Sequence, residues 1–314
     1  MPASKAAYQD FLHRGGVAEL SDRLKLGLRG ADRVRYLNGQ VTSHVAQLRI
    51  GHTQRACITT AKGRLCAEVL ITATPDTLWI DGDASLRDSL PSRLERYIVA
   101  DDVHLLPAPE DTRLLHFIGA IDPDALAALA GQPLTRANRF GIEGWDFWTT
   151  HSALDELWPK FRAQFAELDE PLLETLRIER GVPRWGRELT EETLPPEAGL
   201  ERTHIDYHKG CYIGQEVISR LKSIGHVNRQ LMGFSADSEP LQVGLELFSA
   251  ESGEESGAKP VGKLTSVSWS FALEKPIALG YLKRGAPVQG LIARATTSLG
   301  TQRAISAQPL PFVS

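Results

Sequence analysis

The sequence predicts an α+β fold in which hairpin-forming strands and helices occur in mixed order and an all-β segment follows. Strand-like runs at residues 55–60 and 65–72, rich in Ile, Val, Leu and Thr, are separated by a short turn that contains Gly63. This spacing is typical of a β-hairpin, and no βαβ unit repeats along the chain. Beyond Met232, short strands recur at regular spacing, which indicates a small antiparallel barrel or sandwich.

Length and charge narrow the class of protein. A chain of 314 residues has room for two or three domains with ample core. The net charge of −4 gives no electrostatic reason to expect a nucleic-acid partner. No apolar run approaches the roughly 20 residues that span a bilayer, and residues 1–20 lack the cationic start and apolar stretch of a secretory signal. We therefore expect neither a nucleic-acid nor a membrane partner.

The cysteines indicate the compartment. Cys57, Cys66 and Cys211 are widely spaced and form no CxxC pair. This pattern favours a reducing, cytoplasmic environment and argues against a disulfide framework. It also argues against an iron–sulfur cluster held by this chain alone, because such clusters usually take four cysteine ligands.

Helices are predicted at three places before the barrel. Val34 and Leu37 lie one turn apart ahead of an Asn-Gly stop signal. Leucines and an isoleucine recur every four residues over 86–98, with a kink or a break into two helices at Pro91. Acidic residues and Pro171 begin a third helix that Gly181 ends. Further strands are predicted at residues 77–80, 114–118, 145–149, 245–248, 266–271, 277–282 and 291–297, with a polar loop tip at 251–257.

The motif that carries the most chemistry is Lys209-Gly-Cys-Tyr-Ile-Gly-Gln-Glu216. Gly214 is expected to cap a short helix over residues 217–222 that Gly225 ends. Cys211 then lies just ahead of a helix N-terminus and two residues from Lys209, and both features favour the thiolate. The alternative is an inert cysteine in an apolar turn.

This motif resembles the signature of the YgfZ family, the folate-binding relatives of the glycine-cleavage T-protein that serve iron–sulfur proteins. The run YLNGQVT at residues 36–42 resembles the same family, and so does the order of LRIERG, PEAGL and KGCYIGQE between residues 176 and 216. The resemblance implies a three-lobed ring with mixed α/β folate-binding lobes and a C-terminal antiparallel β-barrel. The domains would be residues 1–232, with a middle lobe inserted at about residues 50–135, and the barrel at 233–314.

The resemblance also implies a site. Cys211 is expected to be the reactive group, with Lys209 lowering its pKa. Tyr212, Gln215 and Glu216 are expected to shape the site by hydrogen bonding, Arg220 to face the same pocket, and Gly210 and Gly214 to permit the turn. Tetrahydrofolate or a one-carbon derivative is the expected cofactor. Asp146 matches an acidic pterin contact of T-proteins, and Asp88 is a rough match for their aspartate near the folate amine. The alternative for Asp146 is an exposed carboxylate on a strand, and the alternative for Asp88 is a solvated position on the surface of a helix.

Several functions fit these residues. The resemblance implies a protein that assists assembly or repair of iron–sulfur clusters, with iron–sulfur client or assembly proteins as partners. A folate-dependent aminomethyltransferase is the alternative, although Leu173 stands where T-proteins carry a folate-contacting arginine. A non-catalytic folate-sensing partner is a third class. Two further readings rank below these. One is a zinc site with His204, His208 and Cys211 as ligands and His226 as the nearby candidate for another, although we expect no metal. The other is a hydrolase in which Cys211 is the nucleophile and His208 or His226 is its base.

Overall fold

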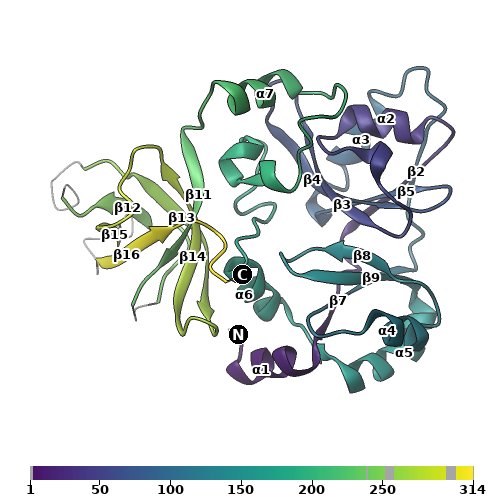
Figure 1. Ribbon diagram of the computed structural model, residues 1–314, viewed down its shortest axis with the longest axis horizontal. Helices are drawn as coiled ribbons and strands as arrows, with labels where there is room; N and C mark the ends of the chain where they lie inside the picture. The colour runs from purple at the N-terminus through teal and green to yellow at the C-terminus, as the bar shows by residue number, and fades with distance from the viewer. Residues whose placement is uncertain (1–2, 238–239, 252–257, 295–301, 314) are drawn as a thin grey trace.

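The computed structural model describes residues 3–237, 240–251, 258–294 and 302–313. Figure 1 shows three lobes arranged around a centre, with helix α6 (Glu170–Glu179) between them. Two lobes are built on five-stranded sheets and the third is a closed antiparallel barrel of six strands. The structure therefore confirms the α+β class and the three-lobed arrangement.

The first lobe carries a sheet of strand order β10-β1-β7-β9-β8. Aromatic side chains form its core, where the ring of Phe161 packs edge-on against Phe117 and Phe147. Edge-on pairs are favourable because the positive ring edge meets the negative ring face. The elements are α1 (Lys5–Arg14), β1 (Gly16–Glu19), β7 (Thr112–Ile118), α4 (Pro123–Ala130), β8 (Thr135–Asn138), β9 (Glu143–Thr150), α5 (His151–Gln164) and β10 (Ala166–Glu167).

The second lobe carries a sheet of order β3-β4-β5-β2-β6. The predicted hairpin is β3–β4, and the expected helix break at Pro91 appears as a 3-10 turn followed by a helix, with Pro91 in that helix's first turn. Proline is tolerated there because the first amides lack partners in the helix. The elements are β2 (Leu24–Arg29), α2 (Arg33–Gln40), η1 (Val45–Gln47), β3 (Thr53–Thr59), β4 (Leu65–Ala73), β5 (Leu78–Gly82), η2 (Ala84–Leu86), α3 (Ser89–Glu95) and β6 (His104–Pro107).

The inserted segment differs from its expected bounds of about residues 50–135. Strand β2 pairs with β5 and β6, so the inserted sheet begins at Leu24 and ends at Pro107. Strand β1 before it and β7 after it pair with each other in the first lobe. Sequence spacing could not locate this boundary because both sheets are built from similar short strands.

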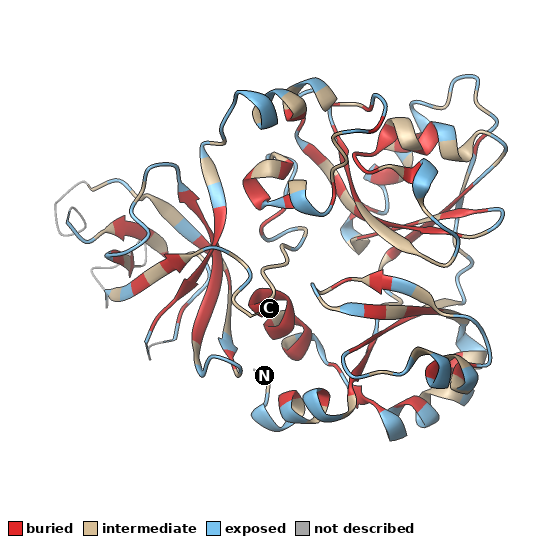
Figure 2. Ribbon diagram, viewed as in Figure 1, coloured by how far each residue is buried: buried red, intermediate tan, exposed pale blue. Residues whose placement is uncertain are grey.

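The barrel closes in the order β11-β14-β13-β12-β15-β16. Apolar residues of its strands form a buried core cluster, and Figure 2 shows many buried residues along these strands. The expected strands at 245–248, 266–271 and 277–282 are present. The expected strand 291–297 is observed to Arg294; its remainder and the loop tip beyond Glu251 lie outside the described residues. The strands are β11 (Arg229–Ser235), β12 (Glu246–Ser249), β13 (Gly262–Ser270), β14 (Lys275–Lys283), β15 (Leu291–Arg294) and β16 (Arg303–Gln308).

Helix α6 joins the lobes to the barrel. Asp169 caps it by accepting a 2.9 Å hydrogen bond from the Leu172 amide, and most of its residues are buried. Within the described ranges, no helix combines the length and the apolar content needed to cross a membrane. The irregular connection after α6 contains η3 (Pro195–Ala198), η4 (Leu200–Arg202) and α7 (Gln215–Ser223).

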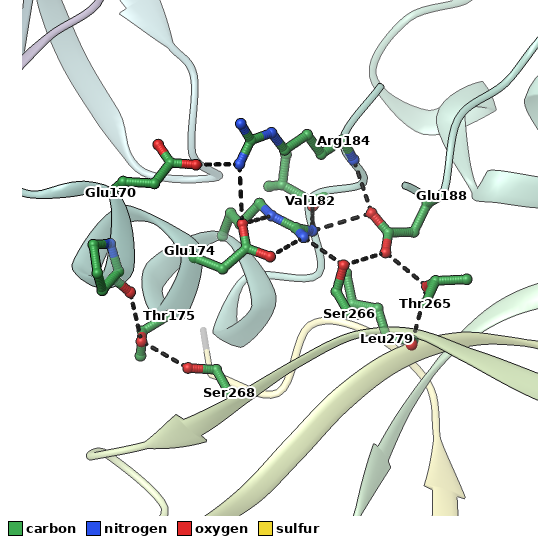
Figure 3. A network of polar contacts seen from close by, with 12 residues as sticks. Glu170, Glu174, Thr175, Val182, Arg184, Glu188, Thr265, Ser266, Ser268 and Leu279 are labelled. Carbon is green, nitrogen blue, oxygen red and sulfur yellow. Dashed lines mark hydrogen bonds and ion pairs between the residues drawn. The ribbon is translucent and has the colours of Figure 1, made fainter. Parts of the chain in front are cut away.

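A buried polar network fixes α6 and this connection to the barrel (Figure 3). Arg177 Nη1 donates to Glu188 Oε2 at 3.1 Å, and Arg177 Nη2 donates to Ser266 Oγ at 2.6 Å. Glu188 Oε1 accepts 2.6 Å hydrogen bonds from the hydroxyls of Thr265 and Ser266. The buried Arg177–Glu188 pair is thus surrounded by further hydrogen bonds, which is the condition under which burying charge is tolerated.

Candidate functional site

A hollow lies where the three lobes meet. It consists of two adjoining cavities of about 340 and 510 Å³ that share Leu70, Val182 and Pro183 in their walls. The smaller cavity, here the α6 half, includes Glu68, Arg139, Phe140, Leu173, Arg177 and Trp185 in its wall. The larger cavity, here the η4 half, includes Arg55, Asn138, Arg180, Thr203, His204 and Gln230. Cavities of this size, apolar with a few polar groups, are typical of small-molecule sites.

Glu68 is the central polar group of this hollow. It lies on β4, and its Oε1 is 3.1 Å from Nε2 of His204. Burial alone would raise the pKa of Glu68, but the hydrogen bond from His204 and the positive charge of Arg55 lower it to about 2. Glu68 is therefore an ionised acceptor on the boundary between the two halves. Sequence reasoning missed it, although a carboxylate within an otherwise mostly apolar strand was a usable signal.

The wall of the α6 half combines apolar surface with cations. Phe140, Leu173 and Trp185 supply apolar surface, and Arg23 and Arg184 line the same cavity. Apolar walls suit a flat ring system, carboxylates suit its N–H edge, and guanidinium groups suit a carboxylate tail. This donor and acceptor set fits a folate.

Asp146 lies outside this hollow wall, which corrects its expected place as a pterin contact. Its side chain is fully buried, and both oxygens are paired, Oδ1 with His116 Nδ1 and Arg139 Nε at 2.8 Å and Oδ2 with Arg139 Nη2 at 2.7 Å. Burial is the largest influence and would raise the pKa of Asp146, but the charge of Arg139 and the hydrogen bonds from His116 and Arg139 together lower it to about 2. Strand pairing explains the burial, because β7 sets His116 directly opposite Asp146.

The expected position of Asp88 near a bound folate is also corrected. It is exposed at the N-cap position of α3 and is not among the residues that line either half of the hollow. Its carboxylate makes no capping hydrogen bond to the helix. The solvated helix surface, the alternative to a folate contact, describes it.

The cysteine motif packs against the YLNGQVT run and the turn between β3 and β4. The Ile213 amide donates to the Gly39 carbonyl at 3.3 Å, and Thr59 Oγ1 donates to the Ile213 carbonyl at 2.5 Å. Gly214 has a φ of 90° and lies so close to the Thr60 carbonyl that a Cβ there would be 2.5 Å from its oxygen. Only glycine fits such a position. The structure thus unites the YLNGQVT run, the β3–β4 turn and the KGCYIGQE motif.

Lys209 differs from its expected role beside the thiol. Its ammonium group is buried and donates to three main-chain carbonyls, those of Asn38, Val41 at 2.6 Å and Ser43 at 2.9 Å. Three hydrogen bonds use all the protons of an ammonium group. Burial lowers the pKa of Lys209 to about 8. Lys209 therefore ties the motif to the end of α2.

The other residues of the motif differ in their burial and in their contacts. Tyr212 is buried and its hydroxyl has no hydrogen-bond partner within the described residues, which corrects its expected role, and burial raises its pKa. A Cβ on Gly210 would meet nothing within 4 Å, so glycine is not sterically required there. Gly214 is the N-cap of α7, as expected. Gln215 Oε1 accepts from the Tyr212 amide at 3.4 Å, while Glu216 and Arg220 are exposed on α7.

Cys211 is exposed, and it is not among the residues that line the central hollow. The exposed position of Cys211 differs from the expectation that its thiol lies at the pterin site. Cys57 is buried and Cys66 is half-buried. Across the residues that the structure describes, no three His, Cys, Asp or Glu side chains are arranged to hold a metal ion, and the zinc candidate His204 is paired with Glu68.

Comparisons with known proteins agree with the fold. Residues 229–313 match the family model of the glycine cleavage T-protein C-terminal barrel domain. The crystal structure of glycine cleavage system aminomethyltransferase T from Bartonella henselae superposes with a TM-score of 0.84 at 19% identity, covering 98% of this chain and 89% of that one. At this identity the match shows the fold alone.

Two curated relatives indicate the family to which this chain belongs. The mitochondrial aminomethyltransferase of Gallus gallus is 26% identical over 301 residues, which cover 84% of this chain and 73% of the relative. The tRNA-modifying protein YgfZ of Sodalis glossinidius is 30% identical over 226 residues, which cover 68% of this chain and 69% of the relative. The chain therefore belongs to the YgfZ family of glycine cleavage T-protein-like proteins.

Proposed function

We propose that this protein binds tetrahydrofolate or a one-carbon derivative in the central hollow and assists assembly or repair of iron–sulfur clusters in client enzymes. The observation that carries the proposal is the α6 half of the hollow, which combines apolar walls with guanidinium groups and several carboxylates, among them the ionised Glu68. The YgfZ relatives are named tRNA-modifying proteins. The clients to test first are therefore tRNA-modifying enzymes that contain an iron–sulfur cluster.

Each part of the folate has a partner among the wall residues. Trp185 and Phe140 would pack against the rings, and Glu68 would accept hydrogen bonds from the N–H edge of the pterin. Arg23 and Arg184, which pair with Asp81 and Glu170 in this structure, would exchange these partners for the carboxylates of the glutamate tail. When bound, the folate supplies a carrier for one-carbon units.

Cys211 would act at the surface. Its thiol is exposed at a turn held by Lys209 on one side and Gly214 on the other. A thiol in this position is accessible to a partner protein. What it would hold or attack is a persulfide, a cluster intermediate or a folate-derived one-carbon unit.

A complementation experiment tests this function. In a strain lacking its own YgfZ, the wild-type chain should restore the activity of iron–sulfur enzymes, and Cys211→Ala should fold but fail to restore it. Cys66→Ala is the matched control, because Cys66 is a half-buried cysteine of β4 and not part of the motif, and it should restore activity. Full rescue by Cys211→Ala would refute the role of the thiol.

A folate-dependent aminomethyltransferase is the second candidate, favoured by the shared fold and the aminomethyltransferase relatives. Leu173 speaks against it, since this position lines the hollow with an apolar side chain where T-proteins carry an arginine. An assay of methylene transfer from an aminomethyl-lipoyl donor separates the two. Turnover at a rate comparable to that of a T-protein would favour the transferase.

A further inference from the structure

Three side chains form a hydrogen-bonded chain along the hollow. Thr203 Oγ1 lies 2.7 Å from Nδ1 of His204, and Nε2 of His204 lies 3.1 Å from Oε1 of Glu68. The imidazole is buried, with 1% of its residue surface exposed, whereas Thr203 is exposed in the wall of the η4 half. A hydroxyl, an imidazole and a carboxylate are thus in series, and the residue that carries the hydroxyl lines the cavity.

Charge fixes the direction of the hydrogen bonds. Glu68 is ionised and can only accept, so Nε2 of His204 carries the proton and donates it. Burial is the largest influence on His204 and lowers its pKa, so the ring is neutral and Nδ1 is an acceptor. The Thr203 hydroxyl must therefore donate to Nδ1. This is the arrangement in which a base takes a proton from a hydroxyl nucleophile and a carboxylate stabilises the resulting imidazolium.

The surroundings of the hydroxyl are cationic. Arg55, Arg180 and Arg202 line the same half of the hollow. Arg55 is half-buried, and it donates hydrogen bonds to the main-chain carbonyls of Asn138 at 2.8 Å and Arg139 at 2.8 Å. Guanidinium groups near a nucleophile stabilise developing negative charge and attract substrates that carry an anionic group.

We propose that Thr203 is the nucleophile of an acyl-transfer site in the η4 half of the hollow, with His204 as its base, Glu68 as the group that orients His204, and anionic acyl donors as its substrates. Thr203 Oγ1 bonds to the acyl carbon while its proton moves to His204 Nδ1. The leaving group departs with that proton. Water then hydrolyses the threonyl ester, so the site needs no reactant beyond the acyl donor and water.

The direct experiment treats the full chain with an alkyl fluorophosphonate and maps the adduct by peptide mass spectrometry. The P–F bond breaks as the Thr203 Oγ1–P bond forms, fluoride leaves, and His204 takes the proton. The adduct is expected on Thr203. His204→Gln should slow its formation at least about 100-fold, the scale of a lost general base. Thr203→Ser should keep the reaction, and His208→Gln, an exposed histidine in the same segment, should leave its rate unchanged.

No adduct on Thr203, or an equal rate in His204→Gln, would overturn the proposal. If circular dichroism shows that His204→Gln does not fold, Glu68→Gln takes its place and should slow labelling at least about 10-fold; an unchanged rate would again overturn the proposal. Substrate class is tested with two esters. Mono-4-nitrophenyl succinate, which carries a free carboxylate, should be cleaved faster than 4-nitrophenyl acetate, and equal rates would contradict the preference for anionic donors. Neither readout depends on folate binding, so this proposal and the proposed function can fail separately.

Discussion

Arg139 holds the carboxylate of Asp146 with two parallel hydrogen bonds of 2.8 and 2.7 Å, and both side chains are buried. Arg139 also pairs with Asp81, which lies on β5 of the other sheet. The guanidinium group therefore connects the first two lobes at the wall of the α6 half of the hollow. This relationship assigns Asp146 to the joint between the lobes, and stability measurements can test that assignment.

Asp146→Asn should lower the free energy of unfolding by about 3–5 kcal/mol, the usual cost of breaking a buried ion pair by removing one partner. An amide cannot accept both hydrogen bonds of the guanidinium group and leaves its charge less compensated. Urea unfolding measures the change. Asp88→Asn, on an exposed carboxylate, is the matched control and should change stability by less than about 0.5 kcal/mol. A stable Asp146→Asn with weakened folate binding would return Asp146 to the binding site.

Stability should fall with acid in two stages. Burial lowers the pKa of His116 and His204 in the folded protein, so below about pH 6.5 the unfolded chain takes up protons that the folded chain does not. The pKa values of Asp146 and Glu68, lowered to about 2, add stability above about pH 4 that is lost as the pH falls toward 2. Urea unfolding between pH 7 and pH 3 measures both stages. A free energy of unfolding that stays constant from pH 7 to pH 4 would contradict the first.

Lys209→Met should destabilise the fold by about 3 kcal/mol or more, because each buried carbonyl that loses its donor costs about 1–3 kcal/mol. Thermal and urea unfolding measure this loss. Lys62→Met, on an exposed lysine of the β3–β4 turn, is the control and should leave stability unchanged. If instead Lys209→Met were as stable as the wild type and slowed the alkylation of Cys211, the lysine would serve the thiol.

Glu188→Gln should loosen the barrel from α6. The amide loses the ion pair with Arg177 and cannot accept the four hydrogen bonds that the carboxylate receives. We expect a loss of about 3 kcal/mol and faster amide exchange in β13, which hydrogen-exchange mass spectrometry resolves. Glu170→Gln removes an exposed partner of Arg184 and should cost no more than about 1 kcal/mol. Equal exchange in both variants would show that the network does not hold the barrel.

Local patterns predicted much of the fold. Hydrophobic periodicity located the β3–β4 hairpin, helix α6 and most barrel strands, because residues close in sequence determine which face of an element is apolar. The bounds of the inserted sheet were wrong because β2 pairs with β5 and β6, strands about 50 to 80 residues later. Such pairings depend on tertiary packing, which local sequence does not encode.

The candidate site, like the fold, was predicted from the sequence only in part. Family-like motifs correctly marked segments that meet in space, and the need for glycine at 214 follows from its turn. The direction in which each side chain points could not be predicted from these motifs. Lys209 turns to carbonyls near α2, and Asp146 faces His116, because their partners come from distant segments. Glu68 and His204 came together from strands and turns 136 residues apart, so no local pattern could join them.

The central claim is that folate occupies the hollow between the lobes, and calorimetric titration with tetrahydrofolate tests it most directly. The wild-type chain should bind one tetrahydrofolate, and Val182→Trp, which fills the wall shared by both halves, should weaken binding at least about 10-fold while keeping the fold. Val99→Trp, on a side chain 88% exposed, is the control and should bind as the wild type does. No heat of binding with the wild type, or equal affinity in Val182→Trp, would contradict the claim.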